Sequence, residues 1–189
     1  MVLTLANDLV TLFVSLETMS LSVYALTGIA RGRSTSAEGA MKYFVLGAMA
    51  SGFLLYGSAL LYGATGTMQL FPLEGDIEAL RYGLAQPSIT MKGPLAVTGV
   101  GCILVAILFK IGAVPFHGWV SDAYEGAPAP STGFMSVAVK AAAFAAFLKI
   151  VLAVGLGAAV SNGEGDWGGV GLSTVLWWVA VLSLIVGNF

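Results

Sequence analysis

Four ionisable side chains stand within or beside apolar runs of the sequence, where a charge is costly. Glu17, Lys110 and Lys140 each interrupt such a run, and His117 is the only histidine of the chain. A charge at the centre of a bilayer costs at least about 2.5 to 3.5 kcal/mol on insertion scales. A carboxylate, two amines and an imidazole held away from water can accept and release protons in turn. These four residues are therefore the candidates for a functional role inside the membrane, and His117, which titrates nearest to neutral pH, is the candidate for passing a proton.

Simpler explanations exist for each charge. A lysine near a helix end can extend its ammonium to the membrane surface, which would explain Lys110 and two further candidates, Lys42 and Lys149. That explanation fits Lys140 poorly, because Lys140 lies near the middle of its apolar run. For Lys140 and Glu17 the alternative is an ion pair that only holds helices together.

Composition places the chain in the membrane. Hydrophobic residues make up 58% of its 189 residues and charged residues 10%, against about 25% charged in soluble domains, and the mean hydropathy is +0.91. At about 20 apolar residues per span, the length allows five spans. The single cysteine, Cys102, excludes a disulfide framework or a cysteine-ligated cluster within the chain, and a net charge of −2 gives no sign of a nucleic-acid partner.

Five apolar segments predict one transmembrane region over residues 1–189. They cover about 9–30, 41–64, 94–125, 130–158 and 170–189. None alternates apolar and polar residues as a membrane strand would, so all are expected to be helices. The spacing of Gly47 and Ser51 in the second predicts close packing against a neighbouring helix.

The third segment is expected to be discontinuous between residues 112 and 118. Pro115 removes a helical hydrogen bond and clashes with the preceding turn, and Gly112 and Gly118 flank it. Broken helices in membranes line polar cavities. His117 directly follows the break, which favours a relay role, although a single histidine is often an ordinary interior residue.

The loops predict an orientation. Residues 31–42 carry three basic residues and one acid, so this loop belongs on the cytoplasmic side. Alternation then places the loop of residues 65–92 outside, the segment 122–130 inside, and the acidic loop 161–169 outside. Both ends of the chain lack the residues that normally flank a span, which predicts a piece of a longer polytopic subunit.

Four strings carry a family resemblance: SLETMSLSVYAL, KYFVLGAMASGFLLYGSALLYG, LFKIGAVPFHGWVSDAYEGAPAP and VAVKAAAFAAFLKI. They resemble the antiporter-like subunits of respiratory complex I over nearly the whole chain. The wording YEGAPAP and KAAAFAAFLK is most similar to the N-type subunit, the counterpart of mitochondrial NADH dehydrogenase subunit 2. The resemblance implies about fourteen spans in two inverted five-helix repeats, of which this chain matches the latter part of the first repeat and a following helix.

The resemblance also implies a function. It makes the chain part of a proton-translocating subunit of NADH:quinone oxidoreductase, with Glu17 paired to Lys110, Lys140 as the central relay and His117 in the polar path between them. NADH, FMN, iron–sulfur clusters and quinone are then expected in partner subunits, with no cofactor or metal in this chain. The expected partners are the lipid bilayer and the M-, L-, K-, J-, A- and H-type membrane-arm subunits.

The expected location is the bacterial cytoplasmic membrane, as a multi-pass protein, in preference to the mitochondrial inner membrane. Two alternatives stay open from the sequence. One is a subunit of a secondary cation/proton antiporter, which would use the same relay without a redox partner. The other is a structural membrane-arm subunit whose charges only hold helices together.

Overall fold

The computed structural model describes residues 2–30, 32–71, 93–162 and 172–188. These residues form helices and an isolated β-bridge between Asp8 and Gln69, without a strand. This confirms the all-α prediction. In chain order the elements are α1 (Val2–Leu5), α2 (Leu9–Thr27), α3 (Ser34–Thr65), α4 (Pro94–Ile111), α5 (Gly118–Gly126), α6 (Ala129–Phe134), the π-helix η2 (Met135–Val139), α7 (Lys140–Asn162) and α8 (Leu172–Gly187).

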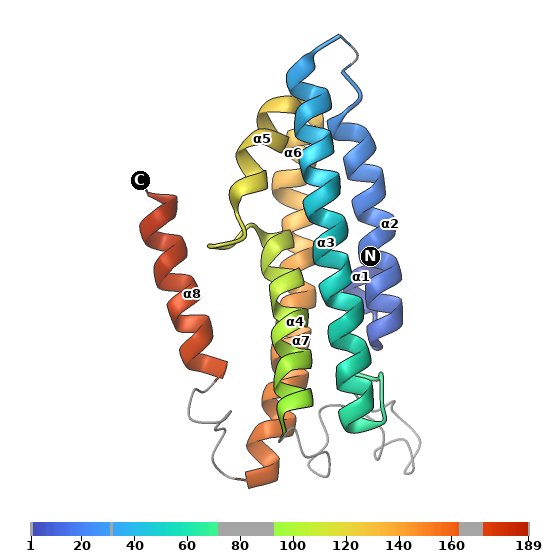
Figure 1. The fold of residues 1–189 in the computed structure, drawn as a ribbon, viewed down its shortest axis with the longest axis vertical. Coiled ribbons are helices and arrows are strands. Elements are labelled where there is room, and N and C mark those ends of the chain that lie inside the picture. Colours follow the sequence, from blue (N-terminus) through green and yellow to red (C-terminus); the bar gives the residue numbers. More distant parts are fainter. Residues whose placement is uncertain (1, 31, 72–92, 163–171, 189) are drawn as a thin grey trace.

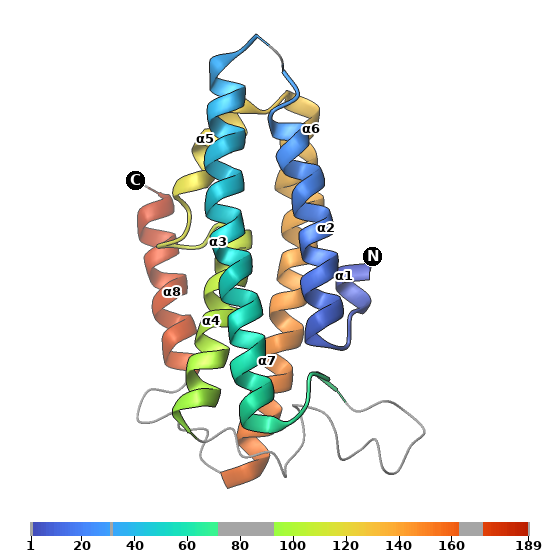
Figure 2. The same cartoon turned by 45° about the vertical axis from the view of Figure 1, so that its right-hand side comes forward.

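The long helices run side by side in one bundle (Figures 1 and 2). Helix α3 packs against α2, α4 and α5, and α4 also packs against α7. Among the described residues, four helical stretches are long and apolar enough to cross a membrane: α2, α3, α4 and the continuous stretch Ala129–Val154. Helix α8 is apolar but shorter, and its Ser183 hydroxyl accepts a hydrogen bond from Val114 N at 3.1 Å, next to the end of α4. The prediction of an all-helical membrane protein is thus confirmed, with four long apolar stretches and the shorter α8 among the described residues.

The second long helix begins at Ser34, earlier than the expected position near residue 41. The polar residues that follow Ser34 lowered the hydropathy but do not oppose a helix. The Ser36 hydroxyl donates to the Thr27 carbonyl at 2.7 Å, which holds this first turn against the end of α2. Gly39 packs so closely on α5 that an added Cβ would lie 2.5 Å from the Asp122 carbonyl oxygen. Helix packing therefore extends α3 beyond its apolar part.

Small residues bring α3 close to its neighbours. A Cβ added at Gly57 would lie 2.6 Å from the carbonyl oxygen of Gly99 on α4, and Gly47 lies directly against the Tyr24 hydroxyl of α2. Such positions let helix backbones approach each other in a membrane. The close packing predicted around Gly47 is present, and it fixes the distance between the helices that carry the candidate residues.

The third span is broken where the sequence predicted. Helix α4 ends at Ile111, and Gly112 adopts a left-handed conformation with φ 79° that donates its N–H to the Leu108 carbonyl at 2.9 Å. Helix α5 begins at Gly118. In Figures 1 and 2, α4 stops near the middle of the bundle and α5 continues to the end at which α2 and α3 are joined. The two half-helices therefore place a helix end in the interior.

The fourth span contains a feature that the sequence did not predict. Residues Met135–Val139 form a π-helix between α6 and α7, where an uninterrupted helix over 130–158 was expected. A π turn carries one residue more than an α turn and is common at functional sites. Lys140 is the residue that directly follows it.

The segment 122–130 and the basic loop lie at the same end of the bundle, as the predicted orientation requires (Figure 1). A Cβ at Gly126 would lie 2.6 Å from the Thr35 carbonyl oxygen, so the two segments touch. The acidic loop and most of the loop 65–92 lie outside the described residues. The side of the membrane that this end faces stays a prediction.

Candidate proton-transfer site

Lys110 is enclosed in the bundle at the end of the broken helix. Only 1% of its surface is exposed, and its Nζ donates to Ser20 Oγ at 2.6 Å and to the Tyr24 hydroxyl at 3.0 Å. Ser20 in turn donates to the Leu16 carbonyl at 2.6 Å. Lys110 also lies in the last turn of α4, where the helix dipole favours a positive charge. The site thus stabilises a cation that has been removed from both water and the lipid surface.

Aromatic rings complete the surroundings of Lys110. Its Nζ lies 5.2 Å from the ring centre of Tyr24, 5.7 Å from that of Tyr43 and 5.9 Å from that of Phe109. Tyr43 stacks on Trp119 of α5, with ring centres 4.2 Å apart. The Trp119 indole N–H donates to the Phe109 carbonyl at 2.9 Å, one of the carbonyls that the break leaves at the end of α4. Trp119 therefore couples the second half-helix to the turn that carries Lys110.

Glu17 lies on the same face of α2 as Ser20 and Tyr24, but it does not touch Lys110 directly. Its carboxylate accepts a hydrogen bond from the Ser51 hydroxyl of α3. It interacts electrostatically with Lys110, yet among the described residues the ion pairs involve Lys42 only. The predicted relation of Glu17 to Lys110 is therefore one of neighbouring charges, with polar side chains of α2 holding the ammonium.

Lys140 is partly buried and faces an aromatic ring. Its Nζ lies 5.5 Å from the centre of the Tyr124 ring of α5, a cation–π geometry. Within the described part of the chain it forms neither a hydrogen bond nor an ion pair. The Tyr124 hydroxyl oxygen is buried and also lacks a hydrogen-bond partner among these residues. Among the described residues, Lys140 and Tyr124 are thus two polar groups with unused hydrogen-bonding capacity.

The remaining lysine candidates each join two segments of the bundle. Lys42 is half exposed and pairs with Glu38 and with Asp122 of α5, both at 2.8 Å. Lys149 donates to the Ala6 carbonyl at 3.0 Å and so ties α7 to the segment after α1. Both contacts have an ordinary structural explanation, and any part in proton transfer stays a prediction.

His117 is exposed and forms the N-terminal cap position of α5. Its backbone carbonyl accepts from Val120 N at 2.9 Å, while its side chain makes no hydrogen bond or ion pair within the described ranges. The structure therefore brings Glu17 and Lys110 into one polar cluster and leaves His117 outside it. The relay role of His117 stays a prediction.

Several residues of the site were missed from the sequence. Ser20 and Tyr24 follow Glu17 at helical spacings of three and seven, which place the three on one helix face. That spacing is a signal that could have identified them. Tyr43, Trp119 and Tyr124 carry no local signal, because their importance depends on which helices meet.

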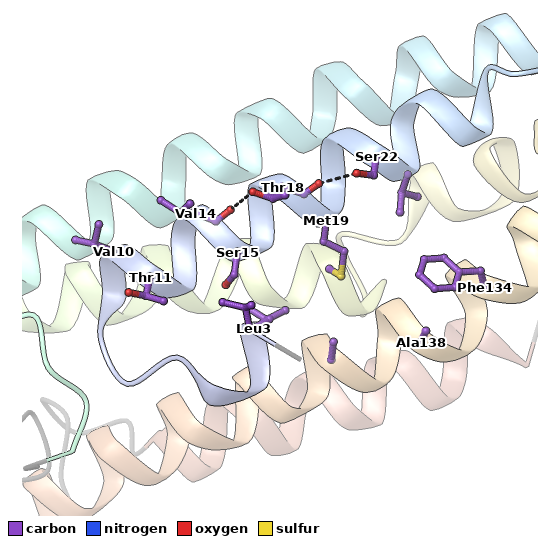
Figure 3. A pocket seen from close by; sticks show the side chains of 13 residues that line it. Leu3, Val10, Thr11, Val14, Ser15, Thr18, Met19, Ser22, Phe134 and Ala138 are labelled. Atoms are coloured by element: carbon purple, nitrogen blue, oxygen red, sulfur yellow. Dashed lines mark hydrogen bonds between the residues drawn. The ribbon is translucent and has the colours of Figure 1, made fainter.

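A separate groove of about 720 Å³ lies between α1, α2 and the stretch from α6 to α7 (Figure 3). The described residues that line it are apolar or carry hydroxyl groups, and none is charged. The hydroxyls of Thr18 and Ser22 donate to carbonyls of their own helix at 2.8 and 3.0 Å. The groove therefore offers no group that titrates, and the candidate proton site lies elsewhere.

Comparison with known proteins identifies the fold. A family model described as "NADH:quinone oxidoreductase/Mrp antiporter, TM" matches residues 6–189. The chain belongs to this family. A relative from Gemmatimonas aurantiaca, named NADH-quinone oxidoreductase subunit N, is 46% identical over 188 residues, which are 100% of this chain and 32% of the relative. Among the curated relatives of this NADH:quinone oxidoreductase/Mrp antiporter family, the chain thus spans about a third of the full length.

Two solved structures of the family carry the same fold. Respiratory complex I from Thermus thermophilus contains a chain that matches with a TM-score of 0.74 and 36% identity, over 99% of this chain and 35% of that one. The Mrp complex from Dietzia sp. matches with a TM-score of 0.64 and 25% identity, over 93% of this chain and 28% of that one. These likenesses confirm the antiporter-like membrane fold expected from the sequence.

Proposed function

We propose that this chain is part of an N-type subunit of NADH:quinone oxidoreductase and carries part of a proton half-channel in its membrane arm. The observation that carries the proposal is Lys110, a buried amine at an interior helix end, held by Ser20 and Tyr24 with Glu17 nearby. Burial disfavours the charged form of an amine, and Lys110 has hydroxyl groups and no carboxylate as its hydrogen-bond partners, so it is not fixed as an ammonium by an ion pair. The relatives at 46% identity support the choice of subunit.

The two charge states suggest how the site would act. Desolvation disfavours the ammonium of Lys110, while the nearby Glu17 carboxylate and the α4 dipole favour it. When the Glu17 charge is neutralised or moves away, Lys110 becomes a better proton donor, and Lys140 is the proposed acceptor of the proton. His117 is retained as a predicted relay at the break. A change in the charge of the Lys110 site would thereby influence proton transfer in the neighbouring subunit.

The redox chemistry is proposed to lie in partners. NADH, FMN, iron–sulfur clusters and quinone would be bound by other subunits, and this chain would use energy delivered from them. The proposed partners are the M-, L-, K-, J-, A- and H-type membrane subunits, in a bacterial cytoplasmic membrane. Within the described residues, no group of three or more His, Cys, Asp or Glu side chains is placed to hold a metal ion.

A secondary cation/proton antiporter subunit is the second candidate, and the likeness to the Mrp complex supports it. The same lysines would then exchange protons against a cation without a redox partner. The higher identity to N-type subunits favours the first proposal.

Purification of the full-length subunit with its partners separates the two. Complex I predicts flavin and iron–sulfur absorbance in the purified assembly, and acidification of inverted vesicles when NADH is supplied with quinone. An antiporter predicts neither, and instead dissipation of an imposed proton gradient when Na⁺ or K⁺ is added. Cation-driven exchange without flavin would refute the first proposal.

A further inference from the structure

Tyr124 carries a buried hydroxyl that the fold does not satisfy. The described residues offer it no hydrogen-bond partner, although buried polar groups are paired in the great majority of cases. The face of the same ring lies 5.5 Å from Lys140 Nζ. If position 124 served only for packing, phenylalanine would fill it equally well. Among the described residues, the Tyr124 O–H has no partner and lies on a ring that faces Lys140, which favours a functional role for it.

Tyr43 connects Tyr124 to the Lys110 cluster. It is 1% exposed, its ring centre is 5.7 Å from Lys110 Nζ, and Tyr124 packs against the buried cluster to which Tyr43 belongs. The two tyrosines come from α3 and α5, which pack against each other. A phenol ring therefore lies beside each lysine, and both phenols pack in the same cluster of side chains.

We propose that Tyr124 is the relay residue between the Lys110 cluster and Lys140, and that its hydroxyl passes the proton together with Tyr43 and bridging water. The inference rests on the proposed function and adds a residue to it. A phenol both donates one hydrogen bond and accepts others, so it can take up a proton on one side while releasing its own on the other. Lys110 loses one proton and Lys140 gains one, and both phenols end neutral with no electron transferred. The Tyr124 ring face then stabilises the ammonium that forms.

Two substitutions separate the hydroxyl from the ring. Tyr124→Phe keeps the ring, its packing and its cation–π contact with Lys140, and removes only the O–H. Tyr124→Leu removes the ring face as well. Tyr56→Phe is the matched control, because Tyr56 lies on α3 with 59% of its surface exposed and outside the Lys110 cluster.

The variants are measured in the full-length subunit within the assembled complex, in inverted vesicles. We expect Tyr124→Phe to lower the rate of NADH-driven proton translocation about tenfold or more, since a positioned proton-transfer group contributes ~10² to 10⁴ in rate. The solvent isotope effect in D₂O should rise, because proton transfer becomes rate-limiting. Tyr124→Leu should lose at least as much, and Tyr56→Phe should match the unaltered complex. Wild-type translocation with an unchanged isotope effect in Tyr124→Phe would overturn the inference.

A second pair of variants keeps the two proposals distinguishable. If Lys140→Met translocates protons normally, the proposed function itself fails. If Lys140→Met is inactive while Tyr124→Phe is normal, only the role of Tyr124 fails. Should Tyr124→Phe not assemble, Tyr43→Phe tests the same path from the Lys110 side: reduced translocation with a raised isotope effect supports the path, and normal translocation refutes it.

Discussion

Replacing Lys140 by methionine should abolish proton translocation without disturbing assembly, and the structure gives the reason for both parts. Within the described residues the ammonium has one partner, the Tyr124 ring at 5.5 Å. Losing this contact costs about 0.5 to 2 kcal/mol. Methionine retains a flexible unbranched chain that fills much of the same space. No hydrogen bond or ion pair of the described residues is broken, so folding should survive.

Lys110→Met is the informative contrast. It would remove two hydrogen bonds from a buried ammonium, to Ser20 and Tyr24. Hydrogen bonds to charged groups contribute about 1.5 to 3 kcal/mol each, and the acceptors would be left buried. Assembly and function are therefore expected to fall together in Lys110→Met, whereas Lys140→Met should separate them.

The assay is NADH-driven acidification of inverted vesicles, with the amount of assembled complex measured on native gels. A positioned proton-transfer group contributes ~10² to 10⁴ in rate, so Lys140→Met should fall below detection. Lys140→Arg should also fail, because arginine stays protonated at any relevant pH and cannot release the proton. Full translocation by Lys140→Arg would show that position 140 supplies only a fixed charge, and the relay through it would be refuted.

Three further predictions concern other parts of the site. Glu17→Ala should leave assembly intact, because Lys110 keeps its two hydrogen bonds, but should reduce translocation measured with quinone reduction; normal coupling would refute a functional role for this carboxylate. Trp119→Phe removes the indole donor from the Phe109 carbonyl, which still accepts from Gly112 N, at a cost of about 0.5 to 1.5 kcal/mol, so the denaturation midpoint of the complex should fall slightly; an unchanged midpoint would show that this bond does not stabilise the contact between the two half-helices. A cysteine at the exposed Ser34 should resist an impermeant thiol reagent in intact cells and react in inverted vesicles; labelling in cells would reverse the predicted orientation.

The parts of the site predicted from sequence are those with a local cause. Lys110 and Lys140 stood out because charge in an apolar run is costly wherever the run packs. The break was predictable because Pro115 and the glycines act on their own backbone. The membrane class follows from composition alone, and the structure agrees on the break and on the membrane class.

The partners of those residues could not be predicted in the same way. Lys110 is held by side chains from α2, which lie 86 to 90 positions away in the chain. Their choice depends on how the helices pack, which hydropathy does not encode. The earlier start of α3 has the same origin, because its first turns are held by Thr27 and α5. His117 drew attention as a residue type, yet its side chain lies on the exposed side of the break.

The π-helix has a geometric consequence for Lys140. Each residue of an α-helix turns the chain by about 100°, whereas a π turn takes one residue more to complete its turn, so every residue after Met135–Val139 lies on a different face from the one that regular winding from α6 would give it. Side chains three or four positions apart across this segment no longer share a face. If the same residues were wound as a regular α-helix, with none removed, the ammonium of Lys140 would swing by roughly a quarter of a circle, off the Tyr124 ring. Proton translocation should therefore depend on the π winding even though every candidate residue would still be present, because the angle at which Lys140 leaves its helix is set five residues upstream.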